Sequence, residues 1–258
     1  MTKKERIDVL LTEQGHVESR SQAQRLVMAG FVFVNDQRVI KPSRKVMGNA
    51  VIEVRQRPPY VSRGGEKLAA ALEAFPIEVN GKICADVGAS TGGFSDCMLQ
   101  SGAAKVYAID VGHGVLHWKL RNDPRVVVME RTNARHLECL PDEIALATVD
   151  ASFISLKMLL PMMKRWLLED GDLVALVKPQ FEAGPQRLSR GGVVRDEETH
   201  QDVLLDILTA AAKLGFIPRG LIRSPLKGPK GNIEFLMWCR LSGDHIAPGK
   251  LIDPLFDH

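Results

Sequence analysis

The chain has 258 residues, 45% of them hydrophobic and 25% charged, which is typical of a globular protein. No apolar run is long enough to span a bilayer, and the charged N-terminus lacks the apolar stretch of a secretory signal. We therefore expect a cytoplasmic protein without a membrane anchor. The four cysteines are scattered, which disfavours disulfides and a zinc ribbon. His113 and His117 lack a third ligand at suitable spacing, so no metal site is predicted.

The net charge of +3 is unevenly distributed along the chain. Residues 1–57 carry 11 Lys and Arg against 6 Asp and Glu, a net charge of +5, whereas the remainder has 23 against 25 and a net charge of −2. This concentration is expected where a segment binds phosphate. On charge alone, a solvated basic surface is an equally good interpretation.

The N-terminal segment, residues 1–57, has the pattern of a small α+β domain. Apolar spacing predicts a helix that begins at Arg6, and Ser19 is a suitable N-cap for a second helix that ends at Gly30. Strand-like runs follow at residues 31–35 and 49–55. Paired prolines then interrupt both helix and strand in Arg57-Pro58-Pro59-Tyr60, so we interpret residues 58–65 as a linker.

From residue 66 onward, apolar strands alternate with helices. Helices are predicted at 66–75, 93–100, 155–168 and 197–214, and strands at 82–87, 105–110, 125–129, 144–150, 172–178, 216–222 and 232–240. Strands that are apolar throughout indicate a mostly parallel sheet with both faces covered, and such sheets bind ligands beyond the carboxyl ends of their strands. We expect this α/β domain to span residues 66–241, followed by a tail at 242–258.

A glycine-rich loop follows the first of these strands and has the sequence D-V-G-A-S-T-G-G-F. It resembles the first motif of the class I methyltransferases rather than a dinucleotide-binding G-x-G-x-x-G loop. The resemblance implies that the loop surrounds the methionine part of S-adenosylmethionine, that Asp110 accepts hydrogen bonds from the cofactor ribose, and that Thr132 and Asn133 contact the adenine. The loop residues implied are Asp86, Gly88, Ser90, Thr91, Gly92, Gly93 and Phe94.

Four charged residues occupy positions that an apolar core disfavours: Lys67 in the helix before the first strand, Asp150 and Lys178 at strand ends, and Glu234 inside the last strand. This Lys-Asp-Lys-Glu set resembles the tetrad of the FtsJ-like ribose 2'-O-methyltransferases. The resemblance implies that Lys178 contacts the target hydroxyl, that the two acids orient and tune it, and that Lys67 completes the site. A neutral Lys178 could accept the hydroxyl proton, and a cationic one could stabilise the alkoxide; the sequence leaves both open.

The N-terminal pieces S-R-S-x-A-x-x-L and G-x-V-x-V-N resemble the small RNA-binding domain named after ribosomal protein S-four. The basic loop at 225–231 is a further candidate for contact with RNA phosphate. The loop at 181–195 either contacts RNA, closes over the site or is a solvated connection. The predicted RNA-binding residues are Arg6, Arg20, Arg25, Lys41, Arg44, Lys45, Arg63, Lys227 and Lys230.

The order of the two parts resembles the TlyA family, particularly in S-R-G-G-E-K-L at 62–68 and K-G-P-K-G-N-I-E at 227–234. The resemblance implies a Rossmann-like class I methyltransferase domain with a seven-stranded sheet, which methylates ribose 2'-hydroxyls of ribosomal RNA, free or in ribosomal subunits. Three alternatives remain: a hemolysin, a name that some family members carry; an RNA-binding protein without methyl transfer; and a nicotinamide-dependent oxidoreductase. The sequence leaves the target nucleotide and the oligomeric state open.

Overall fold

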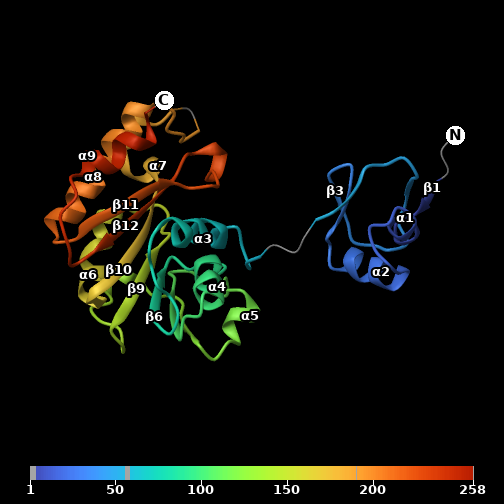
Figure 1. The fold of residues 1–258 in the computed structure, drawn as a ribbon, viewed down its shortest axis with the longest axis horizontal. Coiled ribbons are helices and arrows are strands. Elements are labelled where there is room, and N and C mark those ends of the chain that lie inside the picture. The colour runs from blue at the N-terminus through green and yellow to red at the C-terminus, as the bar shows by residue number, and fades with distance from the viewer. Residues whose placement is uncertain (1–3, 56–58, 190, 258) are drawn as a thin grey trace. The chain divides into compact units, whose positions relative to one another are not determined.

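Two structural units make up the chain, residues 1–58 and residues 59–258 (Figure 1). The computed structural model describes residues 4–55, 59–189 and 191–257. Arg57 and Pro58 of the predicted linker therefore lie outside the described residues. No helix in the described ranges is long and apolar enough to cross a membrane.

The first unit packs two helices against short strands. A three-stranded antiparallel sheet has the order β3-β2-β5, and β1 pairs antiparallel with β4. As predicted, Ser19 is the N-cap of the second helix, and its hydroxyl accepts a hydrogen bond of 3.3 Å from the amide of Gln22. The elements are β1 (Lys4–Arg6), α1 (Ile7–Glu13), α2 (Arg20–Met28), β2 (Val32–Val34), β3 (Gln37–Val39), β4 (Lys45–Met47) and β5 (Ile52–Val54).

The second unit contains a seven-stranded sheet with the order β11-β12-β10-β9-β6-β7-β8. The strands from β6 to β10 pair in parallel, whereas β12 runs antiparallel to both β10 and β11. The fold is therefore α/β with a mostly parallel sheet, as predicted. The strands are β6 (Ile83–Val87), β7 (Lys105–Ile109), β8 (Val126–Met129), β9 (Ile144–Val149), β10 (Leu167–Val177), β11 (Ile217–Arg223) and β12 (Phe235–Arg240).

Helices cover both faces of this sheet (Figure 1). The α-helices of the second unit are α3 (Gly64–Ala74), α4 (Gly93–Gln100), α5 (Trp118–Arg121), α6 (Leu160–Trp166), α7 (Pro179–Glu182), α8 (Glu197–Lys213) and α9 (Pro248–Ile252). Short 3₁₀ turns are η1 (Ala134–His136), η2 (Leu156–Met158), η3 (Pro185–Arg187), η4 (Pro229–Gly231) and η5 (Asp253–Leu255).

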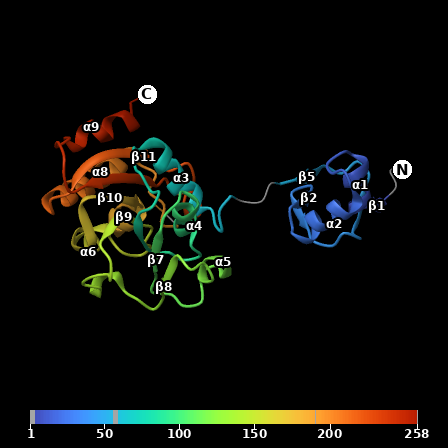
Figure 2. The same ribbon diagram turned by 60° about the horizontal axis from the view of Figure 1, so that its bottom comes forward.

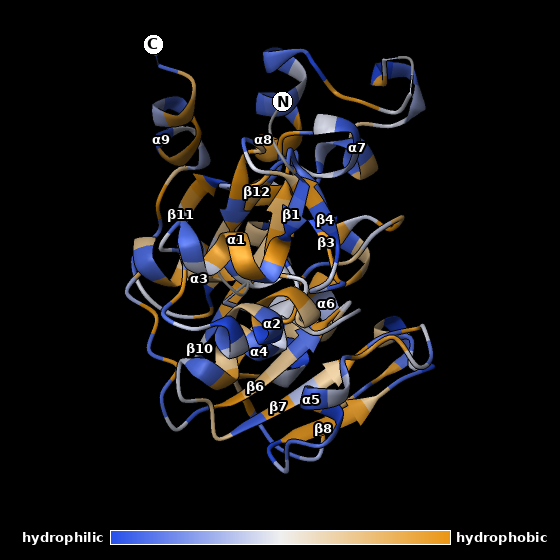
Figure 3. Ribbon diagram, turned by 90° about the vertical axis from the view of Figure 1, so that its right-hand side faces the viewer, coloured by the Kyte–Doolittle hydropathy of each residue, from blue (hydrophilic) through white to orange (hydrophobic). Residues whose placement is uncertain are grey.

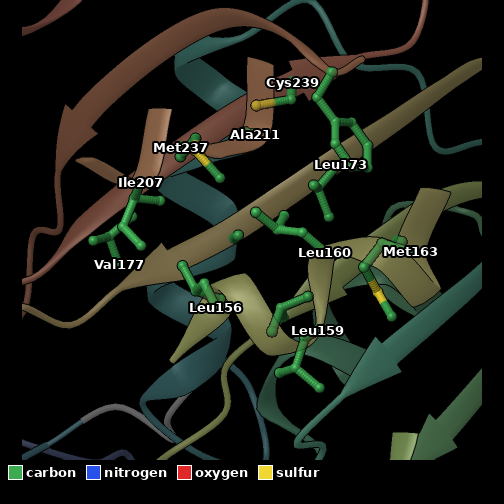
Figure 4. Packing of buried hydrophobic residues seen from close by; sticks show 14 of the residues in the cluster. Leu156, Leu159, Leu160, Met163, Leu173, Val177, Ile207, Ala211, Met237 and Cys239 are labelled. Atoms are coloured by element: carbon green, nitrogen blue, oxygen red, sulfur yellow. The ribbon is translucent and has the colours of Figure 1, made fainter. Parts of the chain in front are cut away.

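Residues 173–177 of β10 show why a strand covered on both faces is apolar at every position. Leu173, Ala175 and Val177 belong to the cluster that η2, α6 and α8 cover (Figure 4). Val174 and Leu176 belong to the cluster under α3 and α4. Successive side chains of a strand point to opposite faces, so a sheet covered on both faces needs apolar residues at every position. In Figure 3 the sheet strands β8, β11 and β12 are largely orange, and the surface helices have mixed colours.

Several regions differ from the sequence-based expectation. Strands β1, β3 and β4 of the first unit were not predicted, and β10 begins at Leu167 rather than at Asp172. The helix predicted at 155–168 is divided into η2 and α6, because Pro161 fits the first turn of α6 but not a helix interior. Helix α3 begins at Gly64, two residues before the predicted start. The tail forms α9 and η5, which pack on α8 and β11 and bury Ile252 and Phe256 (Figure 2).

Candidate active site

The loop between β6 and α4 approaches the end of β9 closely. Gly88 has a φ of +80°, and a Cβ atom at this position would lie 2.7 Å from the carbonyl oxygen of Asp150. Gly92 has a φ of +93°, and its Cβ would lie 2.1 Å from Leu120 Cδ1. Only glycine accommodates both the left-handed backbone and this lack of space. The glycines therefore let the loop pass beside Asp150 with its backbone exposed to the adjacent cavity.

Asp86 is fully buried at the base of this loop. Its Oδ2 accepts hydrogen bonds from the amide (2.8 Å) and hydroxyl (2.6 Å) of Ser95, and its Oδ1 accepts one from the Thr148 hydroxyl (3.2 Å). Burial raises the pKa of Asp86 to about 7, and the charge of Asp150 adds to the effect. Asp86 thus fixes the start of α4 and the strand end at which the loop begins.

Asp110 lies where β7 ends and orders two turns. It accepts hydrogen bonds from the amides of Ser90 (2.8 Å) and Gly112 (2.7 Å). A carboxylate has about four lone-pair positions, so acceptor capacity remains for ligand hydroxyls. Asp110, Thr132 and Asn133 line one cavity of about 400 Å³, which also borders Gly88 and Ser90.

The four predicted tetrad residues lie together as two ion pairs. Lys178 Nζ is 2.6 Å from Asp150 Oδ1, and Lys67 Nζ is 2.6 Å from Glu234 Oε2. Only 9% of the Lys178 side chain and 1% of the Glu234 side chain are exposed. All four line a second cavity of about 330 Å³. Gly88, Ser90 and Asp150 line both cavities, which therefore adjoin.

Glu234 lies just before β12, not inside the last strand as predicted. Its backbone oxygen still accepts a hydrogen bond from Ser224, but the ladder with β10 begins at Phe235. Gly228 passes directly over the carboxylate, since a Cβ there would lie 2.1 Å from Glu234 Oε1. The acid therefore sits beyond the sheet edge, where it reaches Lys67.

Ser152 is a site residue that the sequence reasoning missed. Lys178 Nζ donates a 2.9 Å hydrogen bond to its hydroxyl, and Ser152 lines both cavities. The available signal was its position two residues after Asp150 at a strand end. Ser62 lines the cavity of the ion pairs and was missed as well, because it lies in a segment interpreted as a linker.

A second set of contacts holds the segment after β9 against the segment after β10. Glu182 accepts hydrogen bonds from the Ser155 hydroxyl (2.6 Å) and the Leu156 amide (2.8 Å). The rings of Phe153 and Phe181 lie 4.9 Å apart. Burial raises the pKa of Glu182. These contacts reinforce the Lys178–Ser152 hydrogen bond and fix the distance between the two strand ends.

The predicted basic residues of the second unit have different surroundings. Arg63 and Lys227 line the cavity that contains the ion pairs. Lys230 is exposed, and its Nζ donates a 2.8 Å hydrogen bond to Gly191 O. Buried Asn232 joins the same two loops, because its side chain accepts from the Val194 amide (3.1 Å) and donates to Gly192 O (3.2 Å). The two basic loops are thus held together above the site.

In the first unit the predicted basic residues Arg25, Lys41, Arg44 and Lys45 are exposed, and Arg6 and Arg20 both pair with Asp8. Arg6 lies opposite Lys45 in the β1–β4 pairing, and the amide of Ile7 donates to Arg44 O. Arg6, Arg20 and Lys45, from three parts of the chain, therefore lie close together in one basic surface.

The sheet order, with its antiparallel β12 and the glycine-rich loop after β6, defines a class I methyltransferase. The chain belongs to the FtsJ-like methyltransferase family, whose family model matches residues 60–241. Residues 5–52 match the S4 domain. The resemblance stated from the sequence motifs is confirmed.

Similar proteins span nearly the whole chain. YqxC of Bacillus subtilis is 48% identical over 250 residues, which cover 94% of this chain and 88% of YqxC. The protein named 16S/23S rRNA (cytidine-2'-O)-methyltransferase TlyA of Mycobacterium tuberculosis is 44% identical over 254 residues, 97% of this chain and 95% of TlyA. A solved Streptococcus thermophilus structure with the name hemolysin has a TM-score of 0.74 and 43% identity, covering 98% of this chain and 94% of that one.

Proposed function

We propose that the protein transfers a methyl group from S-adenosylmethionine to a ribose 2'-hydroxyl of ribosomal RNA, with a cytidine as the target nucleoside. The observation that carries the proposal is the pair of ion pairs, Lys178–Asp150 and Lys67–Glu234, in one cavity beside the glycine-rich loop. The name of the Mycobacterium tuberculosis relative supports the choice of rRNA and of cytidine. An rRNA substrate also implies a cytoplasmic protein.

The residues around the two cavities fit the cofactor. The side-chain-free backbone of Gly88 and the remaining acceptor capacity of Asp110 suit a ligand that has both an amino-acid end and a ribose. We propose that Asp110 holds the ribose, that Thr132 and Asn133 contact the adenine, and that the loop residues Asp86, Gly88, Ser90, Thr91, Gly92, Gly93 and Phe94 enclose the methionine part. When bound, the cofactor supplies an electrophilic methyl group.

Lys178 is the residue we propose to contact the reacting oxygen. An ammonium group has three N–H donors. In Lys178 one donor serves Asp150 and a second serves Ser152, which leaves the third for the ribose hydroxyl. In this ion-paired form Lys178 stabilises negative charge as it develops on the oxygen. Asp150 and Ser152 fix the direction of the ammonium group, and the second carboxylate oxygen of Asp150 is available to accept the hydroxyl proton.

Lys67 and Glu234 border the same cavity, and we propose that they position the substrate ribose rather than act on its proton. Arg63 and Lys227 line the cavity and suit the phosphates next to the target nucleotide. The first unit provides the RNA-docking surface, with Arg6, Arg20, Arg25, Lys41, Arg44 and Lys45.

The test is transfer of radiolabel from S-adenosylmethionine to ribosomal subunits and to free rRNA. Lys178→Ala is compared with wild type, and Lys213→Ala, an exposed lysine at the end of α8, is the matched control. We expect label in alkali-resistant dinucleotides, because a 2'-O-methyl group blocks cleavage of the following phosphodiester. The label should fall at least about 100-fold in Lys178→Ala and stay unchanged in the control. Cofactor binding without label on any rRNA substrate would contradict the proposal.

Lys178→Arg separates the two possible roles of the lysine. Arginine stays charged and cannot accept a proton at neutral pH. If Lys178 acts as a cation, Lys178→Arg retains measurable methyl transfer above that of Lys178→Ala. Equal loss in both variants would favour a neutral lysine that acts as the base.

A further inference from the structure

One acidic residue lies at the centre of the basic surface of the first unit. Asp8, on the first turn of α1, has no exposed side-chain surface, and it accepts four hydrogen bonds. Arg6 donates two of them, both of 2.9 Å, from Nε and Nη2; Arg20 Nε donates a third of 3.0 Å, and Gln24 Nε2 donates the fourth of 2.9 Å. One carboxylate thereby joins the start of α1 to the first two turns of α2.

The two arginines remain available at the surface despite these bonds. Their side chains are 39% exposed for Arg6 and 53% for Arg20. Arg20 uses only its Nε on Asp8, and within the described part of the chain its two terminal nitrogens have no protein partner. A guanidinium held by one edge presents its other edge to a phosphate in a fixed direction.

We propose that Asp8 is a positioning residue that holds Arg6 and Arg20 as a preformed clamp for RNA phosphates. The identity of the ligand as RNA rests on the proposed function. A protein or membrane partner is less suited, because the exposed side chains that three separate segments bring together around buried Asp8 include the cations Arg6, Arg20 and Lys45, which suit a polyanion. Holding the arginines in advance removes the entropy cost of ordering two long side chains on binding.

The negative charge of Asp8 allows the clamp to be distinguished from simple charge attraction, because the two predict opposite changes in RNA affinity when that charge is removed. If the surface attracts RNA only through its net charge, removal of a negative charge strengthens binding. If Asp8 positions the arginines, Asp8→Asn weakens binding although the protein becomes more positive. The hydrogen bonds from Arg6 hold the pKa of Asp8 well below its ordinary value, so the wild-type carboxylate is charged throughout the usual assay range.

The experiment measures binding of the full-length protein to 16S and 23S rRNA by filter retention over a range of salt concentrations. Asp8→Asn is compared with Glu18→Gln, which removes the same charge from an exposed side chain of the same unit. We expect Asp8→Asn to bind about 10-fold more weakly than wild type. The slope of log binding constant against log salt concentration should fall in magnitude by about 1 for each freed arginine. Glu18→Gln should bind as tightly as wild type or slightly more tightly. Equal behaviour of the two variants would overturn the proposal.

Arg20→Lys keeps the result interpretable if Asp8→Asn fails to fold. Lysine preserves the charge but has a single ammonium group, which cannot hold Asp8 with one edge and a phosphate with another. We expect weaker rRNA binding than wild type at unchanged thermal stability; wild-type affinity would overturn the clamp.

Methyl transfer separates failure of the clamp from failure of the proposed function. The clamp variants should raise the KM for rRNA and leave kcat unchanged at saturating rRNA, because Asp8 lies in the RNA-docking unit. If wild type methylates rRNA but Asp8→Asn binds it like Glu18→Gln, the clamp is wrong and the function stands. If wild type methylates no rRNA, the proposed function is wrong.

Discussion

Substitutions in the Lys67–Glu234 ion pair test both its contribution to the free energy of unfolding and its role in methyl transfer. The pair spans 2.6 Å, with 13% of the Lys67 side chain and 1% of the Glu234 side chain exposed. Removal of one partner leaves a buried charge without compensation, which costs about 3–5 kcal/mol, whereas replacement of both removes the charges together. Of the two single variants, we expect Lys67→Met to lower the free energy of unfolding more than Glu234→Gln does, because it leaves Glu234, the more buried group, without its partner. The double variant, with Glu234→Gln, should be more stable than the sum of the two single changes by at least about 2 kcal/mol.

This coupling energy is measured by urea unfolding, which is monitored by tryptophan fluorescence. Trp118, Trp166 and Trp238 are the three tryptophans of the chain, and all belong to the unit that contains the pair. The exposed pair Arg187–Asp202, with side chains 50% and 49% exposed, is the control and should couple by less than about 1 kcal/mol.

The same variants separate stability from function. The double variant should fold yet have lost most methyl transfer, because the charges that border the reaction cavity are gone. Additive destabilisation would refute the reasoning about buried charge. Wild-type methyl transfer in the double variant would refute the positioning role.

Three further predictions concern the glycine loop, the buried acid below it and the loops above the site. Gly88→Ala should abolish most cofactor binding, measured by calorimetry, because its Cβ would lie 2.7 Å from a backbone oxygen; Gly81→Ala, with a φ of +73° and no atom within 4 Å of its Cβ, is the control for backbone strain and should bind normally. For Asp86, burial raises the folded-state pKa to about 7 against about 3.9 when unfolded, so its stabilising contribution is present below about pH 4 and is lost as pH rises to about 7. The stability of wild type relative to Asp86→Asn, from urea midpoints, should therefore fall by about 4 kcal/mol over that range, and parallel curves would contradict the burial effect. Asn232→Asp should cost about 1–3 kcal/mol and speed hydrogen exchange in both loops that Asn232 joins, since it loses the donors to Gly192 and Pro229; unchanged exchange would show that other contacts hold the loops.

Much of the sheet could be predicted because both of its faces are covered. The covered part of β10, residues 173–177, is then apolar at every position, and Lys178, the polar residue that follows it, is conspicuous in the sequence. The parallel arrangement brings Asp86, Asp110 and Asp150 to the same edge without knowledge of the contacts. Site residues were thus predictable where a polar side chain lies at the carboxyl end of a strand.

Pairing within the site could not be predicted in the same way. Nothing in the sequence spacing joins Lys67 to Glu234, which are 167 residues apart, rather than to Asp150. The choice depends on α3 lying against β12 and on the close passage of Gly228 over Glu234. Such contacts arise only from tertiary packing, and for the same reason the sequence predicted Glu234 inside the strand when it lies just outside it.

Asp8 shows that the rule which led to the tetrad also applies to the first unit. A charged residue that is buried within an apolar run needs a partner, and this argument led from the sequence to Lys178 and Glu234. Ile7-Asp8-Val9-Leu10-Leu11 is an equally apolar run around one acid. Applied there, the rule demands cations near Asp8, and Arg6 and Arg20 meet that demand in the structure. The arginines predicted to contact RNA are therefore also the groups that make burial of Asp8 possible, so under the proposed clamp we expect a change at Asp8 to alter how they bind RNA.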